Sequence, residues 1–280
     1  KREIIKLEYV FEMPEEEFFK YYSKKKKGSD RYLKAWQNHL DQLYNMIPVL
    51  PFSNLWIAKK LHKLIPDNSS IHFGILNSLR SWNFFTLPDT VDSSANVGGF
   101  GIDGCVSSLI GASLADKNKL YFGIVGDLAF FYDINSLGNK HVGNNVRILL
   151  VNNGIGTEFK NFNHPAAILG DEANGIIAGA GHFGNKSRTL VKNYCESLGF
   201  EYLAASNKKE FNQVYRRFIT GRMLDKPIIF EVFTNYVYES RALEIITSIS
   251  SDTKYTIKKS IKNFIGEENI KRINKIIAKL

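Results

Sequence analysis

Apolar runs alternate with helix-like segments through the middle of the chain. The runs at residues 120–125, 147–151 and 228–233 are almost uninterrupted in their apolar character, as in strands that are buried on both faces. Between them, apolar and small residues recur at the spacing of a helical face. Strands that alternate with helices in this way are typical of a parallel sheet with helices on both faces. We therefore predict an α/β fold with about six parallel strands in one sheet.

The same patterns predict further elements around these runs. The expected elements are strands at 71–75 and 200–204 and helices at 54–64, 105–115, 129–137, 187–198 and 209–221. A long glycine-rich segment, 154–184, follows the second run without clear periodicity. Loops of that length are uncommon in compact domains unless they are functional, so we expect a functional role for it.

The two ends of the chain differ in pattern from the middle. Residues 1–50 are charge-rich, and helices are expected there at 15–22 and 32–46. This segment has the character of a helical linker or of the tail of a preceding domain. Residues 51–250 then form the main domain. Residues 251–280 have the pattern of a C-terminal amphipathic helix, which we expect to pack on the domain or on a neighbouring subunit.

The net charge of +9 comes largely from two lysine-rich segments, 24–27 and 254–279. The first has the character of a solvated loop, and no nucleic-acid-binding motif accompanies either segment, so we expect no nucleic-acid partner. No apolar run reaches the ~20 residues that span a bilayer, so we expect no membrane association. Cys105 and Cys195 are isolated and lack metal-ligand spacing, which favours a reducing, cytoplasmic location.

Polar residues directly follow two neighbouring predicted strands. Gly126 and Asp127 end the first run, and Asn152 and Asn153 end the second. Because the carboxyl ends of parallel strands meet at the edge where open α/β sheets bind ligands, we expect these side chains to lie close together. An aspartate oxygen, an asparagine oxygen and a backbone carbonyl make half of an octahedral shell for Mg²⁺, which phosphate oxygens and water complete. Taken singly, either pair would be interpreted as a helix cap or a turn.

This arrangement resembles the signature of thiamine-diphosphate-dependent enzymes, in which Gly-Asp-Gly precedes a crossover helix and Asn-Asn follows it. The third residue here is Leu128 instead of glycine, as in the menaquinone-pathway 2-succinyl-5-enolpyruvyl-6-hydroxy-3-cyclohexene-1-carboxylate synthases. Further segments that are similar to those synthases lie at 77–78, 101–104, 124–128 and 132–133. The resemblance spans roughly residues 51–250. It implies the diphosphate-binding domain of such an enzyme, which is normally its C-terminal domain.

The resemblance also implies ligands for thiamine diphosphate and Mg²⁺. The implied cofactor-binding residues are Phe100, Ile102, Gly126, Asp127, Leu128, Ala129, Asn153 and Ile155. Among them the metal ligands are the side chains of Asp127 and Asn153 and the carbonyl of Ile155. The backbone N–H groups of Leu128 and Ala129 are expected to face the diphosphate, where the helix dipole adds to the charge of the metal.

A glycine-rich turn at 98–104 forms the second part of the implied site. In these enzymes a large aliphatic side chain after such a turn supports the cofactor in its bent conformation, and Ile102 occupies that position. The resemblance implies that the carbonyl of Phe100 and the N–H of Ile102 contact the aminopyrimidine ring. Without the downstream motif, the segment would be interpreted as an ordinary strand-to-helix turn.

The sequence defines substrate-binding residues less clearly. Asn77, Ser78 and Arg80 are candidates for hydrogen-bonding a substrate carboxylate, and a surface turn is an equal alternative. In the menaquinone-pathway synthases an arginine before the glycine turn binds substrate, whereas Val97 stands at that position in this chain. This departure weakens the case for the menaquinone reaction.

The family's activating glutamate lies on a separate pyrimidine-binding domain, which the other subunit of a dimer normally supplies. The residues before 51 are too few to form one, so we expect no catalytic residue in this chain and no activity of the chain alone. We expect the intact protein to be a homodimer or tetramer. The implied function is that of a lyase or transferase, a decarboxylase or carboligase acting on a 2-oxo acid. An acetolactate-synthase-like carboligase and a non-catalytic, regulatory cofactor-binding subunit are the alternatives.

Overall fold

The structure, a computed structural model, describes residues 10–24, 29–99, 101–176 and 187–249. The chain divides into two compact units, residues 1–46 and residues 47–280, and each is considered by itself. The amphipathic helix predicted at 251–280 lies outside the described residues, and so does Phe100.

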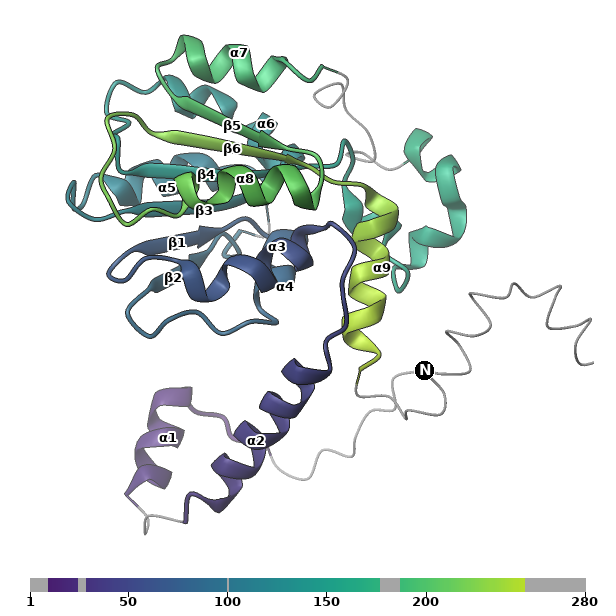
Figure 1. The fold of residues 1–280 in the computed structure, drawn as a ribbon. Helices are drawn as coiled ribbons and strands as arrows, with labels where there is room; N and C mark the ends of the chain where they lie inside the picture. The colour runs from purple at the N-terminus through teal and green to yellow at the C-terminus, as the bar shows by residue number, and fades with distance from the viewer. Residues whose placement is uncertain (1–9, 25–28, 100, 177–186, 250–280) are drawn as a thin grey trace, which may run out of the picture. The chain divides into compact units, whose positions relative to one another are not determined.

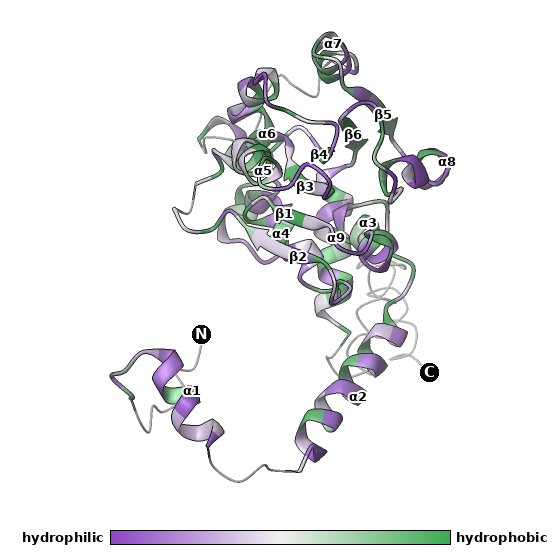
Figure 2. Ribbon diagram, turned by 90° about the vertical axis from the view of Figure 1, so that its left-hand side faces the viewer, coloured by the Kyte–Doolittle hydropathy of each residue, from purple (hydrophilic) through white to green (hydrophobic). Residues whose placement is uncertain are grey.

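The first unit contains two helices, α1 (Glu15–Ser23) and α2 (Arg31–Met46), which confirms both helices predicted there. Neither helix has a buried residue. The apolar side chains of Leu33, Trp36 and Leu40 on α2 are 57%, 58% and 43% exposed. Hydrophobic and hydrophilic residues are mixed along α2 in Figure 2, so it is an amphipathic helix with an exposed apolar stripe.

The second unit is built on one six-stranded parallel sheet with the order β2-β1-β3-β4-β6-β5, which confirms the predicted fold class (Figure 1). The strands are β1 (Ser70–Phe73), β2 (Asp92–Ala95), β3 (Tyr121–Gly126), β4 (Val146–Asn152), β5 (Glu201–Ala205) and β6 (Ile228–Phe233). All residues of β4 are buried, which explains the apolar run from Ile148 to Val151 within it. The sequence does not predict β2, because Asp92, Ser93 and Ser94 are polar and exposed on this edge strand.

Helices connect the strands. They are α3 (Asn54–Leu61), α4 (Asn77–Trp82), α5 (Cys105–Ser113), α6 (Asp127–Tyr132), α7 (Leu190–Ser197), α8 (Lys208–Phe218) and α9 (Tyr236–Thr247), with the 3-10 helices η1 (His62–Leu64), η2 (Ile134–Gly138), η3 (Thr157–Lys160) and η4 (Pro165–Gly175). The helices predicted at 54–64, 105–115, 187–198 and 209–221 are confirmed, with ends that shift by a few residues. None of the described helices combines the length and apolar character needed to cross a membrane.

Three helices differ from the prediction. The crossover helix predicted at 129–137 is wrong in extent, because α6 ends at Tyr132 and the backbone of Asp133, with φ of −121°, is not helical. The sequence pattern does not predict α4, whose six residues are too few to show a helical period. It also misses α9, although Asn235 is a typical N-cap, with a side chain that accepts the N–H of Val237 at 2.8 Å.

Different helices cover the two faces of the sheet. On one face, α5 and α6 pack against β3 and β4, and α7 packs against β5, through a core cluster that includes Leu109 and Phe130. On the other face, Phe211 and Phe218 of α8 contact Phe230 of β6, with ring centroids 5.1 and 5.6 Å apart. The sheet is therefore the middle layer of an α/β/α domain, and only its edges and strand ends remain for ligands.

Arg147 in β4 is fully buried and fixes the carboxyl end of α8 to the centre of the sheet. Its guanidinium donates hydrogen bonds to the carbonyls of Phe218 (2.8 Å), Thr220 and Arg222 (2.6 Å). The last carbonyls of a helix lack partners within the helix, so this side chain supplies donors that the backbone cannot. Burial lowers the pKa of Arg147 to about 10, which still leaves it charged at neutral pH.

We expect Arg147→Met to lower the free energy of unfolding by about 3 kcal/mol, because three carbonyls lose their donor in a dry environment. Urea unfolding measures this change. Arg216→Met on the exposed side of α8 is the matched control and should change stability by less than about 0.5 kcal/mol. Equal effects of the two substitutions would show that Arg147 does not act as a cap.

Candidate active site at the carboxyl edge of the sheet

A cavity of about 200 Å³ opens at the carboxyl ends of β1, β3 and β4, and residues of α3 and α9 complete its wall. The wall contains nine of the eleven residues that the sequence predicts to bind cofactor or substrate: Asn77, Ser78, Ile102, Gly126, Asp127, Leu128, Ala129, Asn153 and Ile155. Of the other two, Phe100 is outside the described residues and Arg80 is not part of the described wall. The fold thus brings three segments to one cavity: the Gly126-Asp127 motif at the end of β3, the Asn152-Asn153 motif at the end of β4, and the turn that contains Ile102, called the Ile102 turn below.

Asp127 begins α6 and joins the ends of β3 and β4. Its side chain is 2% exposed, and Oδ2 accepts the backbone N–H groups of Asn153 (3.0 Å) and Gly154 (2.5 Å). The other oxygen, Oδ1, accepts the N–H of Leu128 at 2.8 Å. The Leu128 N–H, which the resemblance directs at a diphosphate, thus has the carboxylate of the preceding residue as its acceptor in this structure.

The two asparagines after β4 have different surroundings. The side chain of Asn153 lies at the cavity, where Oδ1 accepts the N–H of Ile155 at 3.2 Å. The side chain of Asn152 is buried and donates to Glu231 at 2.7 Å, and Glu231 also accepts from the hydroxyl of Tyr202 at 2.6 Å. Successive residues of a strand point to opposite faces, so only one of the pair reaches the cavity.

The Ile102 turn lies between β2 and α5. Gly104 precedes α5 with φ of 74°, a conformation that favours glycine, and the carbonyl of Asp103 accepts a hydrogen bond from Asn96 at 2.8 Å. The side chain of Ile102 is half-buried against the core cluster and also lines the cavity. Its position is thus consistent with a support for a ligand in the cavity.

The candidate substrate residues Asn77 and Ser78 begin α4, so the alternative of a surface turn is wrong. Ser78 is buried and lines the cavity, and a Cβ on Gly126 would lie 4.0 Å from its Oγ. Leu76 precedes the helix with φ of 66°, which is unusual for a leucine and a sign of backbone strain beside the cavity.

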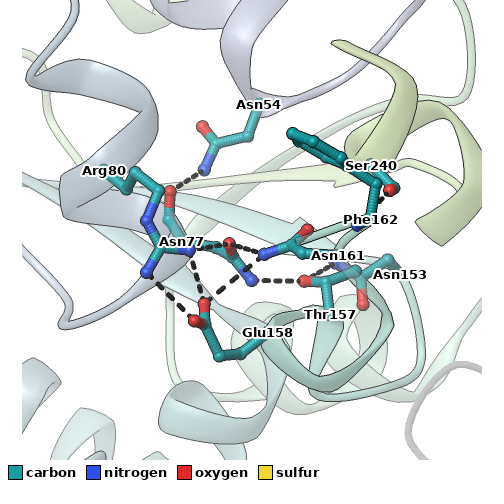
Figure 3. A network of polar contacts seen from close by, with 9 residues as sticks. All are labelled: Asn54, Asn77, Arg80, Asn153, Thr157, Glu158, Asn161, Phe162 and Ser240. Carbon is teal, nitrogen blue, oxygen red and sulfur yellow. Dashed lines mark hydrogen bonds and ion pairs between the residues drawn. The ribbon is translucent and has the colours of Figure 1, made fainter. Parts of the chain in front are cut away.

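A polar network ties α4 to η3 beside the cavity (Figure 3). Asn77 donates to Thr157 at 2.9 Å and accepts from Arg80 (3.2 Å) and Asn161 (3.0 Å). The guanidinium of Arg80 also binds both carboxylate oxygens of Glu158, at 2.5 and 3.0 Å. Arg80 is therefore paired within the protein and is absent from the described wall, whereas Glu158 is part of it. Sequence patterns do not find Glu158, because its partner is distant in the chain.

Glu239 is a second wall carboxyl that sequence reasoning misses, since it lies on the unpredicted α9. It is 8% exposed, and both of its oxygens lie 3.0 Å from the N–H of Asn54 at the start of α3. Burial raises the pKa of Glu239 to about 7, the Asn54 N–H opposes the rise and the charge of Asp127 adds to it. This group therefore changes charge near neutral pH.

The oxygen atoms at the cavity fit Mg²⁺ and a diphosphate. Asp127 offers a carboxylate, Asn153 an amide oxygen and Ile155 a backbone carbonyl, all on the cavity wall. Over the described ranges, no group of three or more His, Cys, Asp or Glu residues is arranged to hold a metal. Mg²⁺ does not need such a group, because proteins typically bind it through one or two carboxylates together with phosphate oxygens and water.

Comparison with known proteins gives relatives of the chain in sequence and in fold. No family model matches the chain. The 2-succinyl-5-enolpyruvyl-6-hydroxy-3-cyclohexene-1-carboxylate synthase of Bacteroides fragilis is 33% identical over 213 residues, which are 76% of this chain and 36% of that protein. The synthase of the same name from Phocaeicola vulgatus is 32% identical over 200 residues, 71% of this chain and 34% of that protein.

A solved structure shares the fold. The thiamine diphosphate-dependent 4-hydroxybenzoylformate decarboxylase of Rhodococcus jostii RHA1 superposes with a TM-score of 0.51 at 17% identity, over 67% of this chain and 33% of that chain. The fold of the chain is thus that of a thiamine-diphosphate-dependent enzyme. Its sequence relatives are the 2-succinyl-5-enolpyruvyl-6-hydroxy-3-cyclohexene-1-carboxylate synthases. It spans about a third of the length of the curated relatives that it matches.

The pKa of Glu239 predicts a dependence of stability on pH. The folded-state pKa of about 7 is above the ordinary value of 4.5, so the contribution of this group to stability is complete below about pH 4.5 and is lost as the pH rises through 7. Between pH 5 and pH 8, the unfolding free energy of the wild type should fall by about 2 kcal/mol more than that of Glu239→Gln. The reason is that glutamine still accepts the Asn54 N–H and does not ionise. Urea unfolding at both pH values checks this. Curves that fall equally in both proteins would contradict it.

Proposed function

We propose that the chain is the thiamine-diphosphate- and Mg²⁺-binding domain of a decarboxylase or carboligase that acts on a 2-oxo acid. The observation that carries the proposal is the meeting of Asp127, Asn153 and Ile102 at one cavity on the carboxyl edge of the sheet. The name of the curated relatives describes a synthase, and the name of the structural relative describes a thiamine-diphosphate-dependent decarboxylase. Thiamine diphosphate, when bound, supplies the carbanion stabilisation that these reactions need.

In this proposal the residues of the chain hold and orient the cofactor. Asp127, Asn153 and the Ile155 carbonyl bind Mg²⁺, and the backbone at Leu128 and Ala129 lies beside the diphosphate. Asp127 and Asn153 now accept backbone N–H groups, so metal binding replaces or shares those hydrogen bonds. Charged oxygen atoms of the diphosphate and of Asp127 repel each other unless a cation lies between them, so the metal is required for tight binding.

We propose a substrate different from that of the menaquinone-pathway relatives. Val97 stands where the resemblance predicts an arginine, and Arg80 is already bound by Glu158. We therefore propose that Asn77 and Ser78, which line the cavity, contact the 2-oxo acid without an arginine of α4. An acetolactate-synthase-like carboligase is the alternative reaction.

The complete site needs groups from outside this domain in our proposal. The catalytic glutamate is supplied by a pyrimidine-binding domain, encoded in the same gene or as a separate chain, within a homodimer or tetramer in the cytoplasm. The supporting observation is that the chain matches about a third of each curated relative. A non-catalytic, regulatory subunit remains the alternative of a different class.

The metal assignment predicts that thiamine diphosphate binds only in the presence of Mg²⁺. Asp127→Asn should weaken Mg²⁺-dependent binding by about ten- to a hundredfold, because it removes the charge but keeps an oxygen that accepts N–H groups. Isothermal titration calorimetry with and without Mg²⁺ measures this. Asp127→Ala separates the structural role, since it also leaves the N–H groups of Asn153 and Gly154 without their acceptor. Equal affinity of the wild type and the asparagine variant would refute the metal assignment.

The half-site interpretation predicts that the chain alone does not decarboxylate 2-oxo acids at a useful rate. In our proposal the acid–base group lies on the pyrimidine-binding domain, and such assistance is worth ~10² to 10⁴ in rate. Adding the pyrimidine-binding domain, fused or as a partner chain, should restore turnover. Ile102→Ala in the restored enzyme should lower kcat more than it weakens cofactor binding, because this side chain supports the cofactor without contacting its charge.

Steady-state turnover of 2-oxo acids separates the two classes of function. Full activity of the isolated chain would overturn the half-site interpretation. Absence of activity after restoration, with cofactor bound, would favour the regulatory subunit.

A further inference from the structure

Helix α6 is a short element with a carboxylate at each end. Asp127 is its first residue and lies in the cavity, and Asp133 directly follows its last residue. Oδ2 of Asp133 accepts two hydrogen bonds from Ser107 of α5, one from the backbone N–H at 2.6 Å and one from the hydroxyl at 2.9 Å. The first N–H groups of a helix have no partner within it, so Asp133 caps α5 from a neighbouring element.

The Ile102 turn is held from two sides. On the strand side, Asn96 donates to the carbonyl of Asp103 at 2.8 Å. On the helix side, the cap on Ser107 fixes the first turn of α5, which begins three residues after Ile102. Gly98 and Gly99, earlier in the segment, are exposed, and a Cβ on either would meet nothing within 4 Å, so packing does not hold them.

We propose that Asp133 is a positioning residue, and that α6 is a spacer which sets the distance between the two ends of the cofactor site. Six helical residues span about 9 Å, which separates the metal ligand at one end of α6 from the cap at the other. The inference rests on the proposed function, because it assigns the diphosphate to Asp127 and the aminopyrimidine to Ile102. In the proposed function the Tyr132-Asp133 motif contacts no ligand. The inference assigns this motif an indirect role in cofactor binding, through Asp133.

Loss of the Asp133 cap should weaken the binding of ligands that reach Ile102 and leave the binding of other ligands unchanged. Without Asp133, the Ser107 N–H loses its acceptor, and the Ile102 turn keeps the hydrogen bond from Asn96, a 3.5 Å hydrogen bond from the Cys105 thiol to the Ile102 carbonyl, and apolar contacts. The turn then adopts its binding conformation in a smaller fraction of the molecules. The apparent affinity of a ligand that reaches Ile102 falls in proportion to that fraction. A ligand that occupies only the Asp127 end is not affected.

Two ligands therefore test the proposal by calorimetry on the chain in the presence of Mg²⁺. Thiamine diphosphate reaches both ends of the site, whereas inorganic pyrophosphate reaches only the Asp127 end. Asp133→Ala should weaken thiamine diphosphate about three- to thirtyfold and pyrophosphate less than about twofold. Asp133→Asn, which retains an acceptor for Ser107, should restore most of the difference. Asp116→Ala is the matched control, because Asp116 accepts one backbone N–H, that of Asn118 at 2.9 Å, beyond the carboxyl end of α5.

The outcomes distinguish this inference from the proposed function. Equal losses for both ligands, or no loss for either, would overturn the role of Asp133 and leave the cofactor assignment standing. A wild-type chain that binds neither ligand would refute the cofactor assignment itself. Hydrogen exchange without ligand provides a second test: Asp133→Ala should speed exchange of the amides at 103–107 but not of those of Asn153 and Gly154. Unchanged exchange at 103–107 would also overturn the proposal.

Discussion

The parallel pairing of β3 with β4 is the constraint on which the site depends. Gly126 and Val151 are partners in this register, so the residues that follow both strands leave the sheet side by side. A shift of β4 by one residue would exchange the faces of Asn152 and Asn153 and turn the wrong asparagine to the cavity. The carboxylate of Asp127 then fixes the backbone after β4 through two hydrogen bonds. The geometry of the site is thus a direct product of strand register.

Around that fixed point, the wall of the cavity is shaped by carboxyl groups that are satisfied within the protein. Glu158 binds Arg80 and so ties η3 to α4, and Glu239 accepts the N–H of Asn54 and so ties α9 to α3. These contacts join segments that are far apart in the chain. They also bring two further carboxyl groups, those of Glu158 and Glu239, to the described wall of the cavity.

The central strands are predictable because burial on both faces leaves an unbroken apolar run, as in the fully buried β4. Edge strand β2 carries no such signal, since Asp92, Ser93 and Ser94 are polar and exposed, and the strand is paired with β1 on one side. The end of α6 is likewise set by a tertiary contact. Asp133 leaves the helical conformation where its side chain caps α5, and the apolar pattern that continues through Ile134 hides this break.

The sequence by itself determined the α/β class and the pairing of a Gly-Asp and an Asn-Asn motif at two strand ends, because both depend on local composition and on short spacings. Nine of the eleven predicted site residues meet at one cavity for this reason. Only the tertiary structure decided that Arg80 is bound by Glu158, that Glu239 enters the wall and that Asp133 holds α5. Each of these contacts joins residues that are distant in sequence, and no local pattern records which partner a side chain reaches after the strands have paired.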